Sequence, residues 1–278
     1  MRMILSSAAL LVATAFHAQD LPQPSPKGKV QQVVGLTNVE VEYSRPSIKG
    51  RVIFGDLVPF DKLWRTGANL NTTIEFSAPV KFGDVDVKAG KYSLFTVPGK
   101  EVWVVHLNSN TELWGEDEFK AEENVATIKV KAEAADLTET LTIDIANVVN
   151  DRAELELRWE KTKVLIPIQA DATEQALANI REAMAKGDMK AGGYGGSARF
   201  CLDRNVMTKE ALTWAQKSVE MDKKFWHVHT LARAQAANGM TKEAIATANE
   251  SMTMAQEAKN EAYVKMNRDL IESLSKGK

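Results

Sequence analysis

The segment from Trp64 to Asn69 reads Trp-Arg-Thr-Gly-Ala-Asn and holds residue types that could bind a ligand. Its glycine and asparagine suit turn conformations, so we expect a loop before the β-rich run that starts at Thr72. Tryptophan offers a flat surface, and arginine offers a fork of donors for a carboxylate, a sulfate or sugar hydroxyls. The alternative is architectural: Trp64 plugs the end of a β domain, and Arg65 pairs with an acid at a strand edge.

On the ligand-binding interpretation, the site would draw on two more aromatic side chains of the same region. The full predicted set is Trp64, Arg65, Asn69, Tyr92 and Trp114. A deep pocket with two or more titratable groups converging on Arg65 would favour an enzyme, whereas a shallow aromatic shelf would favour binding. We assign no catalytic residue and no cofactor, because the common hydrolase motifs are absent from the sequence.

The histidines do not predict a metal site. His106 lies in an alternating run on the face opposite Trp103, where a core or edge histidine is the simpler interpretation. His227 and His229 are two residues apart on an expected helix and should point to different faces. A helical metal site needs a spacing of three or four.

The acidic and glycine-rich stretches also have simple structural interpretations. Asp84-Val85-Asp86 lacks the other ligands of a calcium loop and is expected at a strand-edge turn. The acidic run from Glu116 to Glu118 is expected to be a solvated loop. The glycine-rich stretch from Ala191 to Ser197 lacks the lysine of a phosphate-binding loop, so we predict a flexible joint between helices. The lone Cys201 should be buried among helices.

Residues 30–168 carry the alternation of β-strands. Apolar and polar residues alternate in Val39 to Ser44 and again in Ala153 to Glu160, which predicts one buried and one solvated face. Two further β-rich runs, Tyr92 to Val97 and Val102 to Leu107, flank Pro98-Gly99 and predict a hairpin. About eight short strands without crossover helices predict an antiparallel β-sandwich.

Residues 171–278 are rich in helix formers and contain a repeat. Thr173, Thr208 and Thr241 each begin a similar amphipathic run, 35 and 33 residues apart, and each is placed to cap a helix. The spacing is similar to that of tetratricopeptide repeats, which stack helix pairs into a groove. Gly239 suits the turn between two helices of the last unit. The preceding unit departs from the pattern, which indicates a degenerate array of two to three units.

The start of the chain predicts export. Met1 and Arg2 precede a short apolar run that is followed by small residues, with candidate cleavage sites near Ala15 and after Ala18. This run is too short to span a bilayer, so residues 1–18 read as a signal peptide and residues 19–29 as a proline-rich linker. The expected location is the periplasm or the exterior, and no transmembrane segment is predicted in the mature chain.

Three blocks in order carry a family resemblance: Trp64 to Asn69, Ala89 to Pro98, and Trp103. They resemble the signature of the domain of unknown function 2911 family, whose members are exported proteins of Gram-negative bacteria, often with tetratricopeptide-like helices. The similarity covers about residues 30–168. It implies a shared β fold and carries no activity or catalytic residue to this chain.

Composition restricts the partners without naming one. The formal net charge is −2, with 26% charged and 44% hydrophobic residues, which gives no reason to expect nucleic acid. The leading hypothesis is a non-enzymatic binding or scaffolding protein. A small molecule or glycan would bind the β domain, and a protein or peptide segment would bind the helical groove. The alternatives are an envelope or polysaccharide hydrolase or lyase using the β domain, and a purely structural role.

Overall fold

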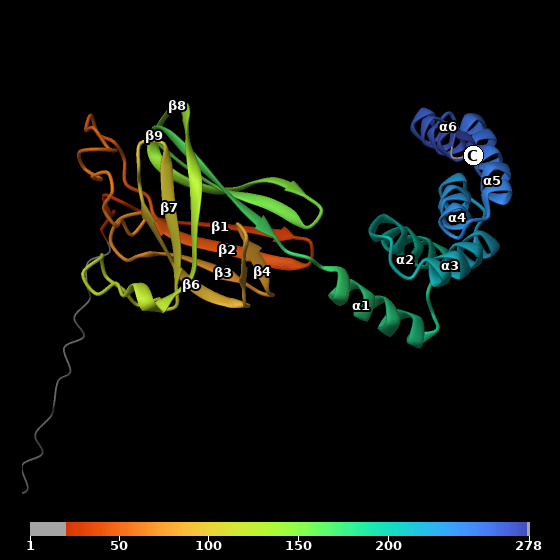
Figure 1. Cartoon of the computed structure of the whole chain (residues 1–278), viewed down its shortest axis with the longest axis horizontal. Helices are drawn as coiled ribbons and strands as arrows, with labels where there is room; N and C mark the ends of the chain where they lie inside the picture. Colours follow the sequence, from red (N-terminus) through yellow and green to blue (C-terminus); the bar gives the residue numbers. More distant parts are fainter. Residues whose placement is uncertain (1–20, 277–278) are drawn as a thin grey trace, which may run out of the picture. The chain divides into compact units, whose positions relative to one another are not determined.

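The computed structural model describes residues 21–276, so the predicted signal peptide and its cleavage sites lie outside the described residues. The chain divides into two compact units, one ending at Asp171 and the other beginning at Ala172 (Figure 1). The first consists of β-strands and the second of helices, as the sequence predicts. Among the described residues, no helix is long and apolar enough to cross a membrane.

Residues 27–169 of the β unit form nine strands in one antiparallel sheet, with the spatial order β1-β2-β3-β6-β7-β8-β9-β4-β5. β1 begins inside the segment that the sequence assigned to a linker. The strands are β1 (Lys27–Val34), β2 (Thr37–Ser44), β3 (Thr72–Phe76), β4 (Val80–Phe82), β5 (Val85–Val87), β6 (Gly90–Val97), β7 (Val102–Asn108), β8 (Asn124–Val149) and β9 (Arg152–Gln169), with a short 3₁₀ helix at Ala121–Glu123.

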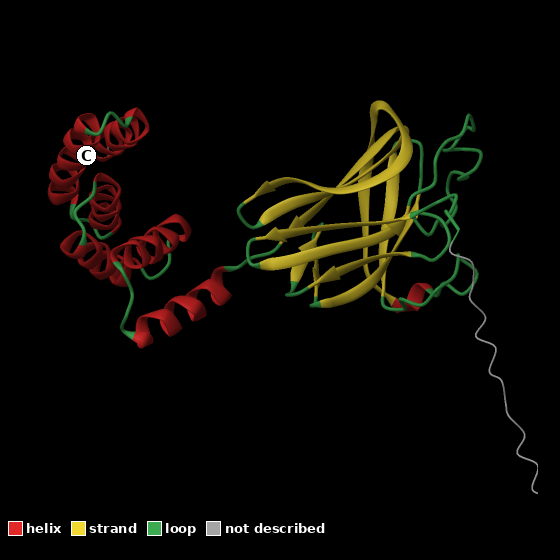
Figure 2. Ribbon diagram, turned by 180° about the vertical axis from the view of Figure 1, so that it is seen from behind, coloured by secondary structure: helices red, strands yellow, loops and turns green. Residues whose placement is uncertain are grey.

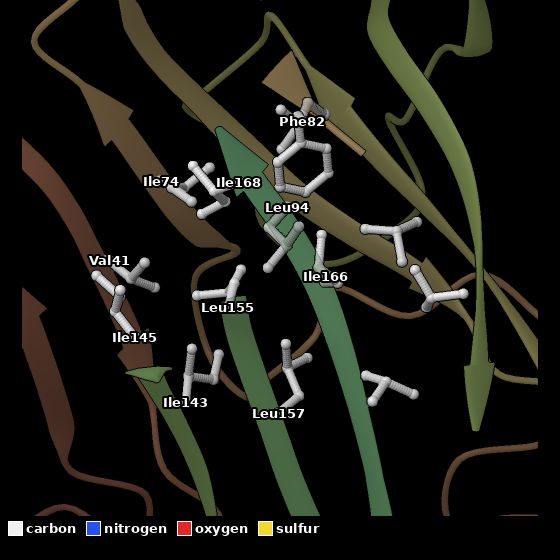
Figure 3. Close-up of a cluster of buried hydrophobic side chains, with 14 of the residues drawn as sticks. Val41, Ile74, Phe82, Leu94, Ile143, Ile145, Leu155, Leu157, Ile166 and Ile168 are labelled. Atoms are coloured by element: carbon white, nitrogen blue, oxygen red, sulfur yellow. The ribbon is translucent and has the colours of Figure 1, made fainter. Parts of the chain in front are cut away.

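β8 joins the two halves of the sheet. Its first part pairs with β7, and from Ala132 onward it pairs with β9, with register shifts between Ala134 and Thr142. The inner faces of the two halves pack against each other as a sandwich (Figure 2). Figure 3 shows β2, β3, β4 and β6 meeting β8 and β9 through Val41, Ile74, Phe82, Leu94, Ile143, Ile145, Leu155, Leu157, Ile166 and Ile168.

The predicted alternation is confirmed in the buried faces. In β9, Leu155 and Leu157 face the core while Glu156 and Arg158 face outward. The hairpin of β6 and β7 also forms where Pro98-Gly99 predicts it. Asp84 and Asp86 lie at the β4–β5 hairpin, a strand-edge turn as expected.

A long irregular segment, the cap loop (residues 45–71), connects β2 with β3. It contributes buried apolar side chains to the core of the β unit, among them Ile48, Ile53 and Val58. Its first part is tied to β8, since Ile48 N donates to Glu139 O over 2.8 Å and Leu141 N donates to Pro46 O over 2.9 Å. The cap loop is therefore a packed part of the β unit.

The helical unit contains α1 (Thr173–Lys186), α2 (Ala191–Arg204), α3 (Thr208–Met221), α4 (Phe225–Ala237), α5 (Thr241–Glu257) and α6 (Glu261–Lys276). From α2 onward each helix packs on the next, and α4 also contacts both α2 and α6. Gly239 adopts a φ of 77° in the turn between α4 and α5, as predicted. The assignment of these helices to the tetratricopeptide class stays a prediction.

Two helix predictions are wrong. The glycine-rich stretch from Ala191 is the first half of α2, because Gly195 lets α2 approach α3 and α4 closely. A Cβ there would lie 2.9 Å from Ser218 Oγ and 3.1 Å from His227 Cδ2. The repeated threonines begin α1, α3 and α5, yet they are the first helical residues, and the caps before them make no side-chain hydrogen bond.

Candidate functional site

The Trp64 to Asn69 segment lies in the cap loop and is fixed by unusual backbone geometry. Thr66 has a φ of 57°, a left-handed conformation that β-branched residues rarely adopt. It is buried and held from both sides, since its hydroxyl bonds Thr96 Oγ1 over 3.0 Å and its carbonyl accepts a bond from Thr72 Oγ1 over 2.8 Å. At Gly67 a Cβ would lie 3.2 Å from Ser44 O. The segment is therefore a specifically shaped turn.

Trp64 belongs to a buried aromatic cluster. Its ring stacks on Trp159 at 5.8 Å and meets Trp103 edge-on at 6.3 Å, and Phe54 packs against all three tryptophans. The Trp64 indole N–H donates to Gly67 O over 3.1 Å, and its backbone pairs with Thr96. Trp64 is 7% exposed. The architectural interpretation of this residue therefore agrees with its burial.

Arg65 pairs with Glu116, which comes from the rim loop (residues 109–120) between β7 and the 3₁₀ helix. Arg65 Nη1 lies 3.0 and 3.2 Å from the two carboxylate oxygens, and Arg65 N donates to Oε1 over 2.9 Å. The acidic run lies in a loop as predicted, with Asp117 and Glu118 exposed, while this ion pair leaves Glu116 partly buried. Arg65 therefore pairs with an acid in a loop, whereas the sequence suggested an acid at a strand edge.

The cap loop and the rim loop run side by side over several residues. Beyond the ion pair, Leu70 forms a β-bridge with Trp114, and Asn71 N donates to Leu113 O over 3.4 Å. Asn71 Nδ2 also bonds Ser93 Oγ in β6, which links the loops to the sheet. The two loops thus hold each other in place.

Beneath the cap loop lies a pocket of about 370 Å³, which we call the cap pocket. Most of its lining residues are apolar by type, but polar atoms make up the larger part of its exposed surface, and its charged lining residues are Arg51, Arg65 and Glu116. The described lining residues are Ser25, Pro46, Arg51, Leu57, Val58, Pro59, Leu63, Trp64, Arg65, Gly67, Ala68, Glu116 and Trp159. The volume suits a small organic ligand.

The structure does not bring the five predicted ligand residues together at the cap pocket. Trp64 and Arg65 line it, whereas the other three do not. Asn69 donates to Ser25 O over 3.2 Å and so attaches the segment before β1. Tyr92 lies in the core and donates to Lys88 O over 3.0 Å. Trp114 is 68% exposed on the rim loop.

Three lining residues that sequence reasoning did not assign to the site are Arg51, Trp159 and Glu116. Trp159 ends the predicted alternating strand and faces inward, so its burial could be read from the pattern. The contact of Trp159 with Trp64 could not be read from the pattern, because the two residues are about a hundred positions apart. Arg51 follows Gly50 in a loop and carries no local signal.

Other chemically capable residues have structural partners. His106 Nδ1 lies 2.9 Å from Thr127 Oγ1, and burial lowers the pKa of this histidine. Cys201 is buried among helices as predicted, and burial raises the pKa of its thiol, so it stays protonated. His227 and His229 contact different partners, Asp222 O and Asn267 Oδ1. Within residues 21–276, no three His, Cys, Asp or Glu side chains form a metal-binding group.

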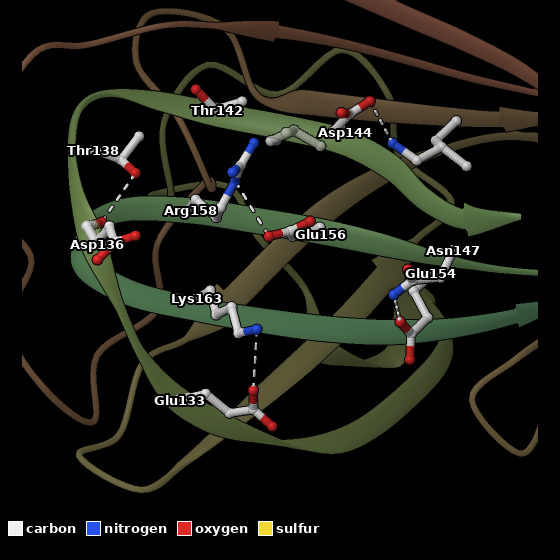
Figure 4. Close-up of polar contacts among 12 residues, drawn as sticks. Glu133, Asp136, Thr138, Thr142, Asp144, Asn147, Glu154, Glu156, Arg158 and Lys163 are labelled. Carbon is white, nitrogen blue, oxygen red and sulfur yellow. Dashed lines mark hydrogen bonds and ion pairs between the residues drawn. The ribbon is translucent and has the colours of Figure 1, made fainter.

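The outward face of β8 and β9 carries a second polar region (Figure 4). Here Arg158 Nε lies 3.2 Å from Glu156 and Lys163 lies 3.4 Å from Glu133. The cations are matched by acids on neighbouring positions of the strands. Such exposed pairs contribute about 1 kcal/mol or less each and are ordinary features of a solvated strand face.

The protein combines an antiparallel β-sheet, whose cap loop lines a pocket, with a unit of packed helices. The family model described as "Protein of unknown function (DUF2911)" matches residues 25–168. The chain therefore belongs to this family, as the motif blocks indicated, and the match begins five residues before the predicted boundary. Searches of the curated proteins and of the solved structures found no match.

Proposed function

We propose that the β unit is a non-enzymatic ligand-binding module and that the cap pocket is its site. The observation that carries this proposal is the cap loop itself. Loops longer than about 12–15 residues without regular structure are uncommon in compact domains and are usually functional. This one packs several side chains into the core and also lines a pocket in which charged side chains lie among apolar residues.

The charges in the pocket favour binding over the alternative of a polysaccharide hydrolase or lyase. Most glycosidases use two carboxylates about 5–9.5 Å apart, one of which has a raised pKa. Glu116 is the one carboxylate among the described lining residues, and Arg65 neutralises it at 3.0 Å. Glu116 therefore supports the shape of the pocket better than it would transfer a proton.

Tryptophan fluorescence tests the pocket directly, because Trp64 and Trp159 both line it. We expect a screen of sugars, organic acids and peptides to find a compound that shifts the emission saturably and raises the melting temperature. Leu57→Ala should weaken that effect, since Leu57 is 45% exposed and lines the pocket. Leu137→Ala, at a 63% exposed position on β8, is the matched control. Equal responses in both variants would place the ligand elsewhere.

We also propose that the protein is exported, on the pattern of residues 1–18. Mass spectrometry of the native protein should then find a new N-terminus between Thr14 and Leu21. Recovery of mature protein that keeps Met1 would exclude cleavage.

For the helical unit we propose a tetratricopeptide-like scaffold that binds a protein segment. Its support is the 35- and 33-residue spacing of the helix starts at Thr173, Thr208 and Thr241, and the consecutive packing of α2, α4 and α6. A photoreactive residue at the 39% exposed Trp226 should crosslink a partner in native cells. The same group at Leu137 in the β unit should not. Crosslinking that is equal at both positions would contradict a helical binding surface.

A further inference from the structure

Arg51 holds a fixed positive charge at the cap pocket. Its Nε donates to Ile48 O over 2.9 Å and its Nη2 donates to Ser47 O over 2.6 Å. Both acceptors are backbone carbonyls, so they orient the guanidinium without neutralising it. In the part of the chain that the structure describes, no carboxylate forms an ion pair with Arg51, and its Nη1 keeps its donors for another group.

The second arginine of the pocket, Arg65, does not keep an unneutralised positive charge. Arg65 is neutralised by Glu116, which accepts bonds from both its guanidinium and its backbone N–H. The described charged lining residues are two arginines and one glutamate, which leaves one positive charge, located on Arg51. A bound anion would therefore meet a cation that is already oriented, with little side-chain entropy left to lose.

The remaining walls select the rest of the ligand. Leu57 and Pro59 line the pocket as exposed apolar residues, and the nearly buried Val58, Trp64 and Trp159 line it as well. These groups favour an apolar or ring-shaped body. They would also make a doubly charged anion costly to hold, because a second charge would be desolvated without a partner. The volume of about 370 Å³ limits the ligand to a small molecule or to one terminal residue of a larger one.

We propose that the cap pocket selects a small monocarboxylate with an apolar ring or branched chain, whose carboxylate binds Arg51. This inference rests on the proposed function of the pocket and names the chemical class of its ligand. The guanidinium fork matches a carboxylate in one plane, and the exposed apolar residues Leu57 and Pro59 contact the apolar body. Arg51 is then the specificity-determining residue of the site.

Hydrocinnamate and hydrocinnamyl alcohol form a matched pair of probes, because they differ only in the carboxylate. Titrated into the full-length mature protein and followed by tryptophan fluorescence, hydrocinnamate should bind at least tenfold more tightly than the alcohol. Arg51→Gln should weaken hydrocinnamate about tenfold and leave the alcohol unchanged. Arg51→Lys should keep part of the preference, because it retains the charge without the fork. Arg158→Gln, on the outer face of β9, should change neither affinity.

The outcomes separate this inference from the function on which it rests. Equal affinities for the acid and the alcohol in the wild-type protein would overturn the role of Arg51 while keeping the pocket as a binding site. An Arg51→Gln variant that loses both probes equally would show that Arg51 shapes the loop, and would also overturn it. Binding of neither probe, together with a wider screen that shifts nothing, would overturn the pocket and the inference alike. Since the wild-type comparison needs no variant, a poorly folded Arg51→Gln protein leaves the test decisive.

Discussion

Large side chains fill the interior of the β unit, whereas small ones fill much of the interior of the helical unit. Among the fully buried residues of the β unit are Ile53, Ile74, Phe76, Phe82, Leu94, Phe95, Leu107, Leu155, Ile166 and Ile168. Fully buried residues of the helices include Ala198, Cys201, Ala211, Ala215, Ala232, Ala234, Ala244, Ala248 and Ala255. The sheet is stabilised mainly by the apolar area that it removes from water, and the helices by close approach of their backbones.

Both units also contain buried polar contacts. In the helical unit, His229 Nδ1 donates to Asn267 Oδ1 over 2.8 Å, and Asn267 Nδ2 donates to Ser251 Oγ over 2.9 Å. Ser251 in turn donates to Phe225 O over 2.7 Å, so the network links α4, α5 and α6. Asn267 and Ser251 are fully buried. This network fixes how α4, α5 and α6 pack, as the Thr66–Thr96 and Asn71–Ser93 hydrogen bonds fix the cap loop of the β unit.

The largest expected effect follows from removing volume in the β unit. Trp64→Ala should lower the free energy of unfolding by roughly 3–5 kcal/mol, because it leaves a cavity beside Trp103 and Trp159. Chemical denaturation followed by tryptophan fluorescence measures it. Trp114→Ala, at a 68% exposed position, should change stability by about 0.5 kcal/mol or less. Similar losses in the two variants would contradict the assignment of Trp64 to the core.

A smaller effect is expected from adding volume in the helical unit. Gly195→Ala places a Cβ 2.9 Å from Ser218 Oγ, so it should cost about 1 kcal/mol or more through overpacking. At the neighbouring Gly196 a Cβ meets nothing within 4 Å. Gly196→Ala should therefore stabilise the unit by up to about 1 kcal/mol through helix propensity. Thermal unfolding followed by the helical circular dichroism signal compares the two variants. Equal shifts in their melting temperatures would mean that close helix packing does not require Gly195.

The smallest expected effect is a pH dependence that is specific to the helical unit. Burial lowers the pKa of His229, the Asn267 hydrogen bond opposes this, and Arg233 adds to it. The unfolded chain therefore binds a proton at a higher pH than the folded one. Stability should be full above the unfolded pKa of about 6.5 and should fall as the pH drops below it towards the folded pKa.

Denaturation of the helical signal at neutral and mildly acidic pH measures this dependence. His229→Gln should flatten it, because glutamine keeps a polar group near Asn267 and does not titrate in this range. An unchanged slope in His229→Gln would show that His229 is not the source of the acid sensitivity.

The sequence by itself determined the features that depend on neighbours along the chain. Alternation located β2 and β9, the Pro98-Gly99 turn located the β6–β7 hairpin, and the repeated Thr-initiated runs located α1, α3 and α5. Gly239 marked its turn because a left-handed backbone favours glycine. These signals are local, since they depend on which face a residue presents and which φ it can adopt.

Tertiary structure alone decided the contacts between distant segments. β8 pairs first with β7 and then with β9, and so passes from one half of the sheet to the other. The partner of Arg65 is Glu116, and the stacking partner of Trp64 is Trp159. Gly195 of α2 lies against Ser218 of α3 and His227 of α4, a contact that no local signal announces. Periodicity predicts that a side chain is buried. It does not predict which distant side chain packs against it, because that contact forms only in the folded chain.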